Sequence, residues 1–124
     1  PAALDFMGSL MAGGWPELMK TNRGLALKGR AILCDALQLP KPSTEDVIGS
    51  LAAIPLPHRF MACENSVQGA QRLHDSLYFQ EGIEVPVIFW PGQRSLILRV
   101  SAQVYNSESD YEYLADALKS RSVG

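Results

Sequence analysis

Apolar side chains recur at helical spacing in the first third of the chain. They predict a short helix over residues 3–11, which the pair Gly13-Gly14 ends. A second, longer helix is expected to begin with Pro16, because proline needs no amide partner at a first helical position, and to run to about Leu37. The prolines that follow lack an amide donor and stop this helix.

The middle of the chain predicts a strand and a third helix. Residues 48–56 form a short apolar run closed by prolines, which is typical of a buried strand. Residues 58–64 are expected to form a loop. Asn65 followed three residues later by Gln68 resembles a capping box, and an apolar stripe at helical spacing then continues to Gly82.

The last third predicts a hairpin and a final helix. Apolar residues alternate over 83–90 and again over 96–101, on either side of a turn at residues 91–94. Pro86 restricts the first arm to a sheet edge or a bulge, because it cannot donate to a ladder. Ser107 with Asp110 matches a helix-capping pattern ahead of the last apolar stripe.

These elements predict an α+β fold. Its small three-stranded sheet consists of one β-hairpin plus one further strand, with helices packed mainly on one face, two of them N-terminal and one C-terminal. No internal repeat or low-complexity tract is present, and 124 residues suffice for one core. We therefore expect residues 1–124 to form a single domain.

Composition and charge narrow the possible partners. The formal net charge is −2 and the basic residues are scattered, which argues against nucleic acid and anionic membranes. No apolar run approaches the roughly 20 residues of a membrane span and no signal peptide is seen, so a cytoplasmic location is expected. Cys34 and Cys63 stand apart, which indicates buried thiols rather than a metal site or redox pair.

The most suggestive segment for binding is residues 98–107, where a strand ends in a polar loop that leads into a helix. Arg99 faces away from Leu98 and Val100, and a buried arginine needs solvent or an anion for its head. Its planar fork suits a carboxylate ligand. Spacing alone favours the alternative that Arg99 extends from an exposed sheet face or pairs with Glu84 on the neighbouring strand.

Tyr105 and Asn106 follow Arg99 on the same segment and are ambiguous in the same way. An asparagine before a helix is often turn chemistry, and a tyrosine there often packs its ring with the hydroxyl in water. The rest of the sequence offers few candidate catalytic residues. His58 and His74 have no nucleophile arranged around them, and none of the lysines resembles a Schiff-base residue; these are Lys20, Lys28, Lys41 and Lys119.

The first fifteen residues carry more apolar surface than a short terminal helix normally hides. This helix either caps the core of its own domain or faces something outside the chain. Because the chain begins at Pro1 within an apolar pattern, we expect it to be a fragment or a processed product.

Several segments resemble the class V aminotransferase-fold enzymes that use pyridoxal phosphate (PLP), and most closely their isopenicillin-N-epimerase-like branch. The matching segments are residues 1–6, 13–17, 48–53 and 98–106. The similarity covers essentially the whole chain, as the C-terminal small domain of a protein several times longer.

The resemblance implies specific roles. The family's R-[IV]-S-A-x-x-Y-N segment is similar to Arg99 through Asn106, so Arg99 is expected to hold the α-carboxylate of an amino-acid substrate, with Tyr105 and Asn106 in supporting positions. The large domain, absent from this chain, is expected to supply the PLP lysine. The parent enzyme is expected to be a homodimer, and the isolated chain, with no cofactor of its own, to be inactive.

Members of this family differ in reaction, which includes epimerisation, transamination, desulfuration and elimination. The resemblance therefore leaves the substrate and the reaction subtype open. A different class of function also stays open, namely a free-standing α+β ligand-binding or regulatory module that dimerises through its sheet or first helix.

Overall fold

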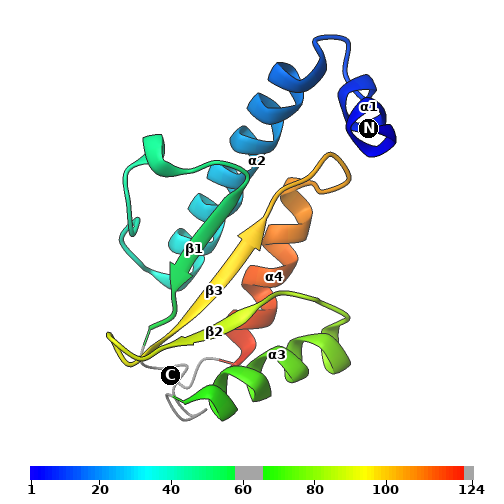
Figure 1. The fold of residues 1–124 in the computed structure, drawn as a ribbon. Helices are drawn as coiled ribbons and strands as arrows, with labels where there is room; N and C mark the ends of the chain where they lie inside the picture. The colour runs from blue at the N-terminus through cyan, green and yellow to red at the C-terminus, as the bar shows by residue number, and fades with distance from the viewer. Residues whose placement is uncertain (58–65, 122–124) are drawn as a thin grey trace.

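The computed structural model describes residues 1–57 and 66–121. Its helices and strands follow one another in the order shown in Figure 1. They are α1 (Ala2–Ser9), α2 (Gly14–Leu37), a 3-10 turn η1 (Glu45–Val47), β1 (Leu51–Pro55), α3 (Val67–Glu81), β2 (Val87–Trp90), β3 (Ser95–Ser101) and α4 (Glu108–Arg121).

The three strands form one antiparallel sheet in the order β1-β3-β2, so that β3 is central. The hairpin of β2 and β3 is present as predicted, with the turn at residues 91–94. Pro86 directly precedes β2, and β2 lies at a sheet edge, which is the position that a proline at this point requires.

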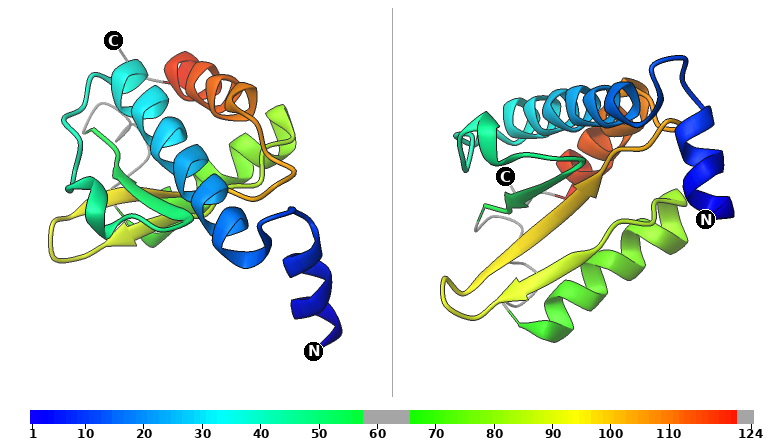
Figure 2. Two further views of the ribbon diagram at one scale, coloured as in Figure 1. Left: turned by 90° about the horizontal axis from the view of Figure 1, so that it is seen from above. Right: turned by 45° about the horizontal axis from the view of Figure 1, so that its top comes forward.

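One face of the sheet is buried and the other is open. Leu98 and Val100 on β3 pair with Ile54 and Ala52 on β1, and all four side chains point into the core. Helices α2, α3 and α4 contribute the other buried side chains of that core. Figure 2 shows α2 and α4 side by side over the sheet, with α3 alongside β2. The predicted α+β architecture, with helices mainly on one face, is confirmed.

The long helix starts earlier than its sequence predicts. Helix α2 begins at Gly14, which has a positive φ of 65°, so Pro16 lies within the first turn rather than at the first position. A proline is tolerated there because the first amides of a helix have no partner inside it. Glu17 instead accepts a hydrogen bond from the Gly13 amide at 2.6 Å. The predicted end at Leu37 is confirmed.

Two strands are shorter than predicted. Strand β1 spans Leu51–Pro55 rather than residues 48–56, because η1 and the turn after it occupy the preceding residues. Strand β2 begins at Val87 rather than at residue 83, immediately after Pro86, which cannot donate to the ladder.

The cap of α3 also differs from the prediction. Ser66 is the N-cap, and its hydroxyl accepts a hydrogen bond from the Gly69 amide at 3.0 Å. A serine with extended backbone geometry satisfies one of the amides that a helix start leaves free. The expected loop over residues 58–64 and the expected cap Asn65 lie outside the described residues. The end of α3 at Gly82 is confirmed, in left-handed conformation with φ 67°.

Helices α2 and α4 approach closely where a glycine faces an aromatic ring. A Cβ placed at Gly29 of α2 would lie 2.7 Å from the ring of Tyr111 on α4. Tyr111 is buried, and its hydroxyl donates a 2.7 Å hydrogen bond to the carbonyl of Ser101 at the end of β3. This contact ties α4 to the central strand just beyond Arg99.

We expect Tyr111→Phe to lower the free energy of unfolding by about 1 kcal/mol, because the Ser101 carbonyl loses its donor while the ring stays in place. Burial raises the pKa of the Tyr111 hydroxyl above its ordinary value of about 10. A raised folded-state pKa contributes stability below pH 10 that is lost as the pH rises through that pKa. Chemical denaturation from pH 7 to 11 should therefore show the difference between wild type and variant shrinking above pH 10. A constant difference over this range would contradict the assignment.

Candidate functional site

Arg99 lies on the open face of the sheet, near the end of the central strand. It pairs in register with Ala53 of β1, and its side chain is exposed. Within the described residues, the guanidinium forms no ion pair and no side-chain hydrogen bond. The predicted alternative, an ion pair between Arg99 and Glu84, is therefore absent from the described residues. The head group is available to a ligand.

A pocket of about 340 Å³ has Arg99 in its wall. Tyr105 and Asn106 line the same pocket, so the three residues singled out from the sequence converge in space. The opposite wall is the segment 83–86, which approaches because the Arg99 amide donates a 3.0 Å hydrogen bond to the Pro86 carbonyl. The site thus lies where β3 ends, between the start of the edge strand and the loop into α4.

The loop between β3 and α4 is fixed by its own side chains. Asn106 accepts a hydrogen bond from the Gln103 amide at 3.0 Å, and Asp110 accepts one from the Ser107 amide at 3.0 Å. The second contact confirms the helix cap predicted from Ser107 and Asp110. Asn106 therefore shapes the loop, whereas Tyr105 is 82% exposed and its side chain is open to solvent beside the pocket.

The loop is also anchored to α2 by a residue that the sequence reasoning missed. Asn22 is buried, and its side-chain amide donates a 3.0 Å hydrogen bond to the side chain of Gln103. The sequence could have indicated that Asn22 is buried, because it stands four residues from Leu18 and four from Ala26 on the same face of the helix. A buried polar side chain on an apolar stripe needs a partner, and the Asn22 amide nitrogen finds one in Gln103 of the loop between β3 and α4.

The pocket wall carries side chains of both charges. One cation, Arg99, shares the wall with the carboxylates of Glu84 and Asp110. None of the chain's lysines lines this pocket, and Lys28 and Lys41 are engaged with Glu108 and Glu45 elsewhere. An unpaired guanidinium can hold a carboxylate through two parallel hydrogen bonds.

Tyr111 also lines this pocket, whereas His74 and Cys34 do not. His74 on α3 stacks on Tyr78 and contacts Asp75, which lowers the pKa of that carboxyl; a further hydrogen bond from Gln71 acts in the same direction. Cys34 is a buried free thiol, as predicted, and burial raises the pKa of this thiol. His58 and Cys63 fall outside the described residues. Within residues 1–57 and 66–121, no cluster of three or more potential metal-binding side chains is found.

None of the helices in the described ranges combines the length and the apolar character that crossing a membrane requires. No family model matches the chain. The chain is similar to an L-cysteine desulfhydrase of Arabidopsis thaliana, with 29% identity over 132 residues. That similarity covers 95% of this chain but 28% of the relative, so the chain spans under a third of the length of the protein that it resembles.

Proposed function

We propose that this chain is the C-terminal domain of a longer PLP-dependent enzyme acting on an amino acid, and that Arg99 holds the α-carboxylate of the substrate. The observation that carries the proposal is the position of Arg99, which lines a pocket with Tyr105 and Asn106 and whose guanidinium forms no ion pair within the described residues. Tyr105 would contact the substrate, and Asn106 would hold the conformation of the loop between β3 and α4.

The similarity to an L-cysteine desulfhydrase supports this assignment. Removing sulfide from an amino acid requires charge at Cα to be stabilised, and PLP supplies that electron sink when bound. The protein must then fix the substrate relative to the cofactor, which is the task that a bidentate arginine performs. We extend the proposal to the class V aminotransferase fold and its isopenicillin-N-epimerase-like branch, and to a homodimeric, cytoplasmic parent enzyme.

The residues of this chain do not fit attachment of the cofactor itself. The Arg99 pocket contains no lysine among its lining residues, and Lys20 lies on α2 beside a different pocket. The lysine that binds PLP would therefore belong to the rest of the longer enzyme. The open sheet face around Arg99, with Leu51, Ile88 and Trp90 exposed, is where that part would lie against this domain.

We expect the isolated chain mixed with PLP to give no absorbance band of lysine-bound cofactor and no adduct after borohydride reduction, since no lysine lines the site. Spectrophotometry and mass spectrometry of the reduced mixture check this. A reducible adduct of defined stoichiometry on one lysine would contradict the assignment of the cofactor to another part of the enzyme.

The alternative is a free-standing module that dimerises through its sheet or first helix. The observation in its favour is that both surfaces expose large apolar side chains. The coding sequence ahead of Pro1 separates the two. A long preceding segment with a candidate PLP lysine favours the enzyme, and a start codon immediately before Pro1 favours the module.

A further inference from the structure

Gln103 is the first residue of a turn that carries two residues of the Arg99 pocket. The Asn106 amide donates a 2.8 Å hydrogen bond to the Gln103 carbonyl, and the Gln103 amide donates a 3.0 Å hydrogen bond back to Oδ1 of Asn106. Tyr105 lies inside this turn and is mostly exposed, so the backbone of the turn, rather than packing of the ring, determines where Tyr105 lies. The position of Gln103 therefore sets the positions of Tyr105 and Asn106.

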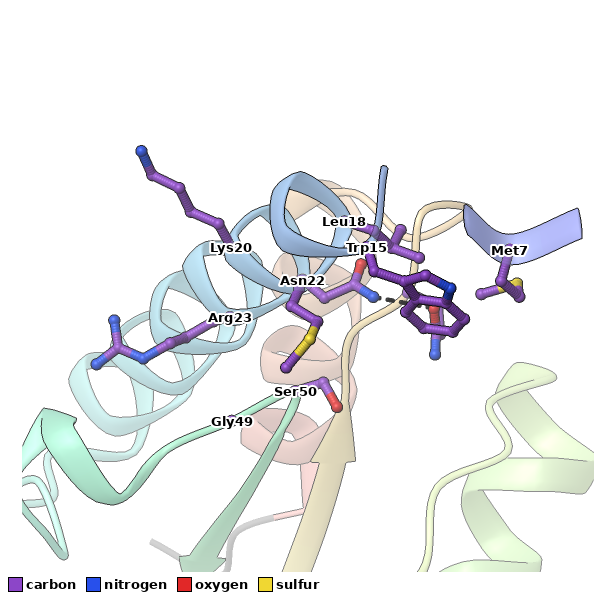
Figure 3. Close-up of a pocket in the computed structure, with 10 residues that line it drawn as sticks. Met7, Trp15, Leu18, Lys20, Asn22, Arg23, Gly49 and Ser50 are labelled. Atoms are coloured by element: carbon purple, nitrogen blue, oxygen red, sulfur yellow. Dashed lines mark hydrogen bonds between the residues drawn. The ribbon is translucent and has the colours of Figure 1, made fainter. Parts of the chain in front are cut away.

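A side-chain hydrogen bond attaches Gln103 to α2. Its Oε1 accepts the 3.0 Å hydrogen bond from Nδ2 of Asn22, which Figure 3 draws as a dashed line. The residue before Gln103, Ala102, is buried, and its amide donates to the carbonyl of Ser50 at 2.8 Å. The backbone is thus fixed beside the start of β1 just before the turn, and the contact with Asn22 then holds the turn itself against α2.

Asn22 is a polar residue in an apolar position. It is 6% exposed, and its neighbours one helical turn away on the same face, Leu18 and Ala26, are both 1% exposed. Within the described residues, Oδ1 of Asn22 has no hydrogen-bond partner. Burying an unpaired amide oxygen lowers stability, and an apolar side chain of similar size has no such cost. Packing therefore does not account for an asparagine here, whereas its bond to Gln103 does.

We propose that Asn22 is a positioning residue for the Arg99 pocket, and that it acts through Gln103. The hydrogen bond between them holds the turn so that Tyr105 and Asn106 stand at the pocket beside the bound carboxylate. This inference rests on the proposed function, to which it adds a residue that does not itself touch the substrate.

Arg99 does not depend on this contact. Its position in the sheet is set by its register with Ala53 and by the 3.0 Å hydrogen bond from its amide to the Pro86 carbonyl. Loss of the Asn22 bond therefore leaves the carboxylate anchor in place and loosens one wall of the pocket. The substrate then binds less tightly, while the reaction of bound substrate continues.

The surroundings of the bond separate its effect on binding from an effect on stability. Asn22 and Gln103 also line a pocket of about 420 Å³ between α1 and α2, which is large enough to hold water. A water molecule can therefore replace Asn22 as the partner of Gln103. The Gln103 side chain then keeps a hydrogen bond but loses its attachment to α2.

The first test is Asn22→Leu in the longer enzyme. We expect KM for the amino-acid substrate to rise about 10-fold, less than the roughly hundredfold cost of a 1 Å misplacement of the substrate itself, and kcat to change by less than about threefold. The midpoint of thermal unfolding should not fall, because an apolar side chain replaces an unpaired buried amide. Leu33→Met, at a fully buried position of the same helix, is the matched control and should leave KM and kcat unchanged.

Two further variants test the path of the effect. Gln103→Leu changes a half-buried residue and should raise KM as Asn22→Leu does, and the double variant should show no more than the larger single effect. In an Arg99→Ala background, Asn22→Leu should change KM by less than about twofold, because without its anchor the carboxylate no longer meets the turn.

Three results would overturn the inference and leave the proposed function in place. One is an Asn22→Leu enzyme with the wild-type KM beside an Arg99→Ala enzyme with a raised KM. Another is a fall in kcat and in the unfolding midpoint at unchanged KM, which indicates a structural role. The third is a double variant in which the effects of Asn22→Leu and Gln103→Leu add. Wild-type kinetics of Arg99→Ala would instead remove the proposed function, and this inference with it.

Discussion

Replacing Arg99 by alanine in the longer enzyme should lower kcat/KM for its amino-acid substrate by about 100-fold or more, mainly through KM. Arg99 is among the residues that line the pocket and forms no ion pair within the described residues, so under the proposed function its guanidinium is free to bind the substrate carboxylate. Removing the fork deletes two charge-assisted hydrogen bonds and lets the substrate shift, and misplacement by about 1 Å alone costs on the order of a hundredfold in rate. Steady-state kinetics measure this effect.

Two further variants make the Arg99 result specific. Arg99→Lys keeps the charge but loses the planar fork, so it should fall between wild type and alanine. Lys20→Ala removes an exposed cation of α2 that lines a different pocket (Figure 3) and should leave kcat and KM unchanged. PLP absorbance should be retained in all three proteins. Unchanged kinetics of Arg99→Ala with every amino acid tested would end the carboxylate assignment.

Gly29→Ala should be the most destabilising of the single-methyl additions in this chain, with a loss of about 2 to 3 kcal/mol in the free energy of unfolding. The new Cβ would lie 2.7 to 2.9 Å from three atoms of the Tyr111 ring, and Tyr111 is buried. The ring cannot move without breaking its hydrogen bond to Ser101, so α2 and α4 must separate, and overpacking of this kind costs about 1 to 3 kcal/mol.

The same helix offers a matched control for Gly29→Ala. Gly24 is exposed, and a Cβ there would meet nothing within 4 Å. Gly24→Ala should therefore raise the free energy of unfolding by up to about 1 kcal/mol through helix propensity. Urea denaturation of both variants checks the pair. Equal effects of the two substitutions would show that α2 and α4 do not approach through Gly29.

At the candidate site, the sequence predicted the position of Arg99 but not its partner. Its alternation with Leu98 and Val100 placed it on the face opposite the core, and the structure confirms this. The pattern left open whether Glu84 neutralises it, because an ion pair depends on the path of segment 83–86, which Pro86 keeps out of the strand. The family resemblance, rather than spacing, pointed to a carboxylate.

Asn22 and Gln103 show what the sequence could not supply. They are 81 residues apart, and a hydrogen bond joins them only because α2 lies across the end of β3. The contact of Gly29 with Tyr111 likewise joins residues that are far apart in the sequence. A glycine in a helix predicts only local weakness, and its packing role appears when the partner helix is in place.

Periodicity in the sequence determined the helices, the hairpin and the face on which Arg99 lies, because these follow from local geometry with periods of 3.6 and 2. Pro86 narrowed the position of β2 to a sheet edge or a bulge. Tertiary structure alone decided the convergence of Arg99, Tyr105 and Asn106 on one pocket, and the exposure of Phe6 on α1. These features depend on contacts between distant segments. A local pattern carries no information about which surfaces such contacts cover and which they leave open.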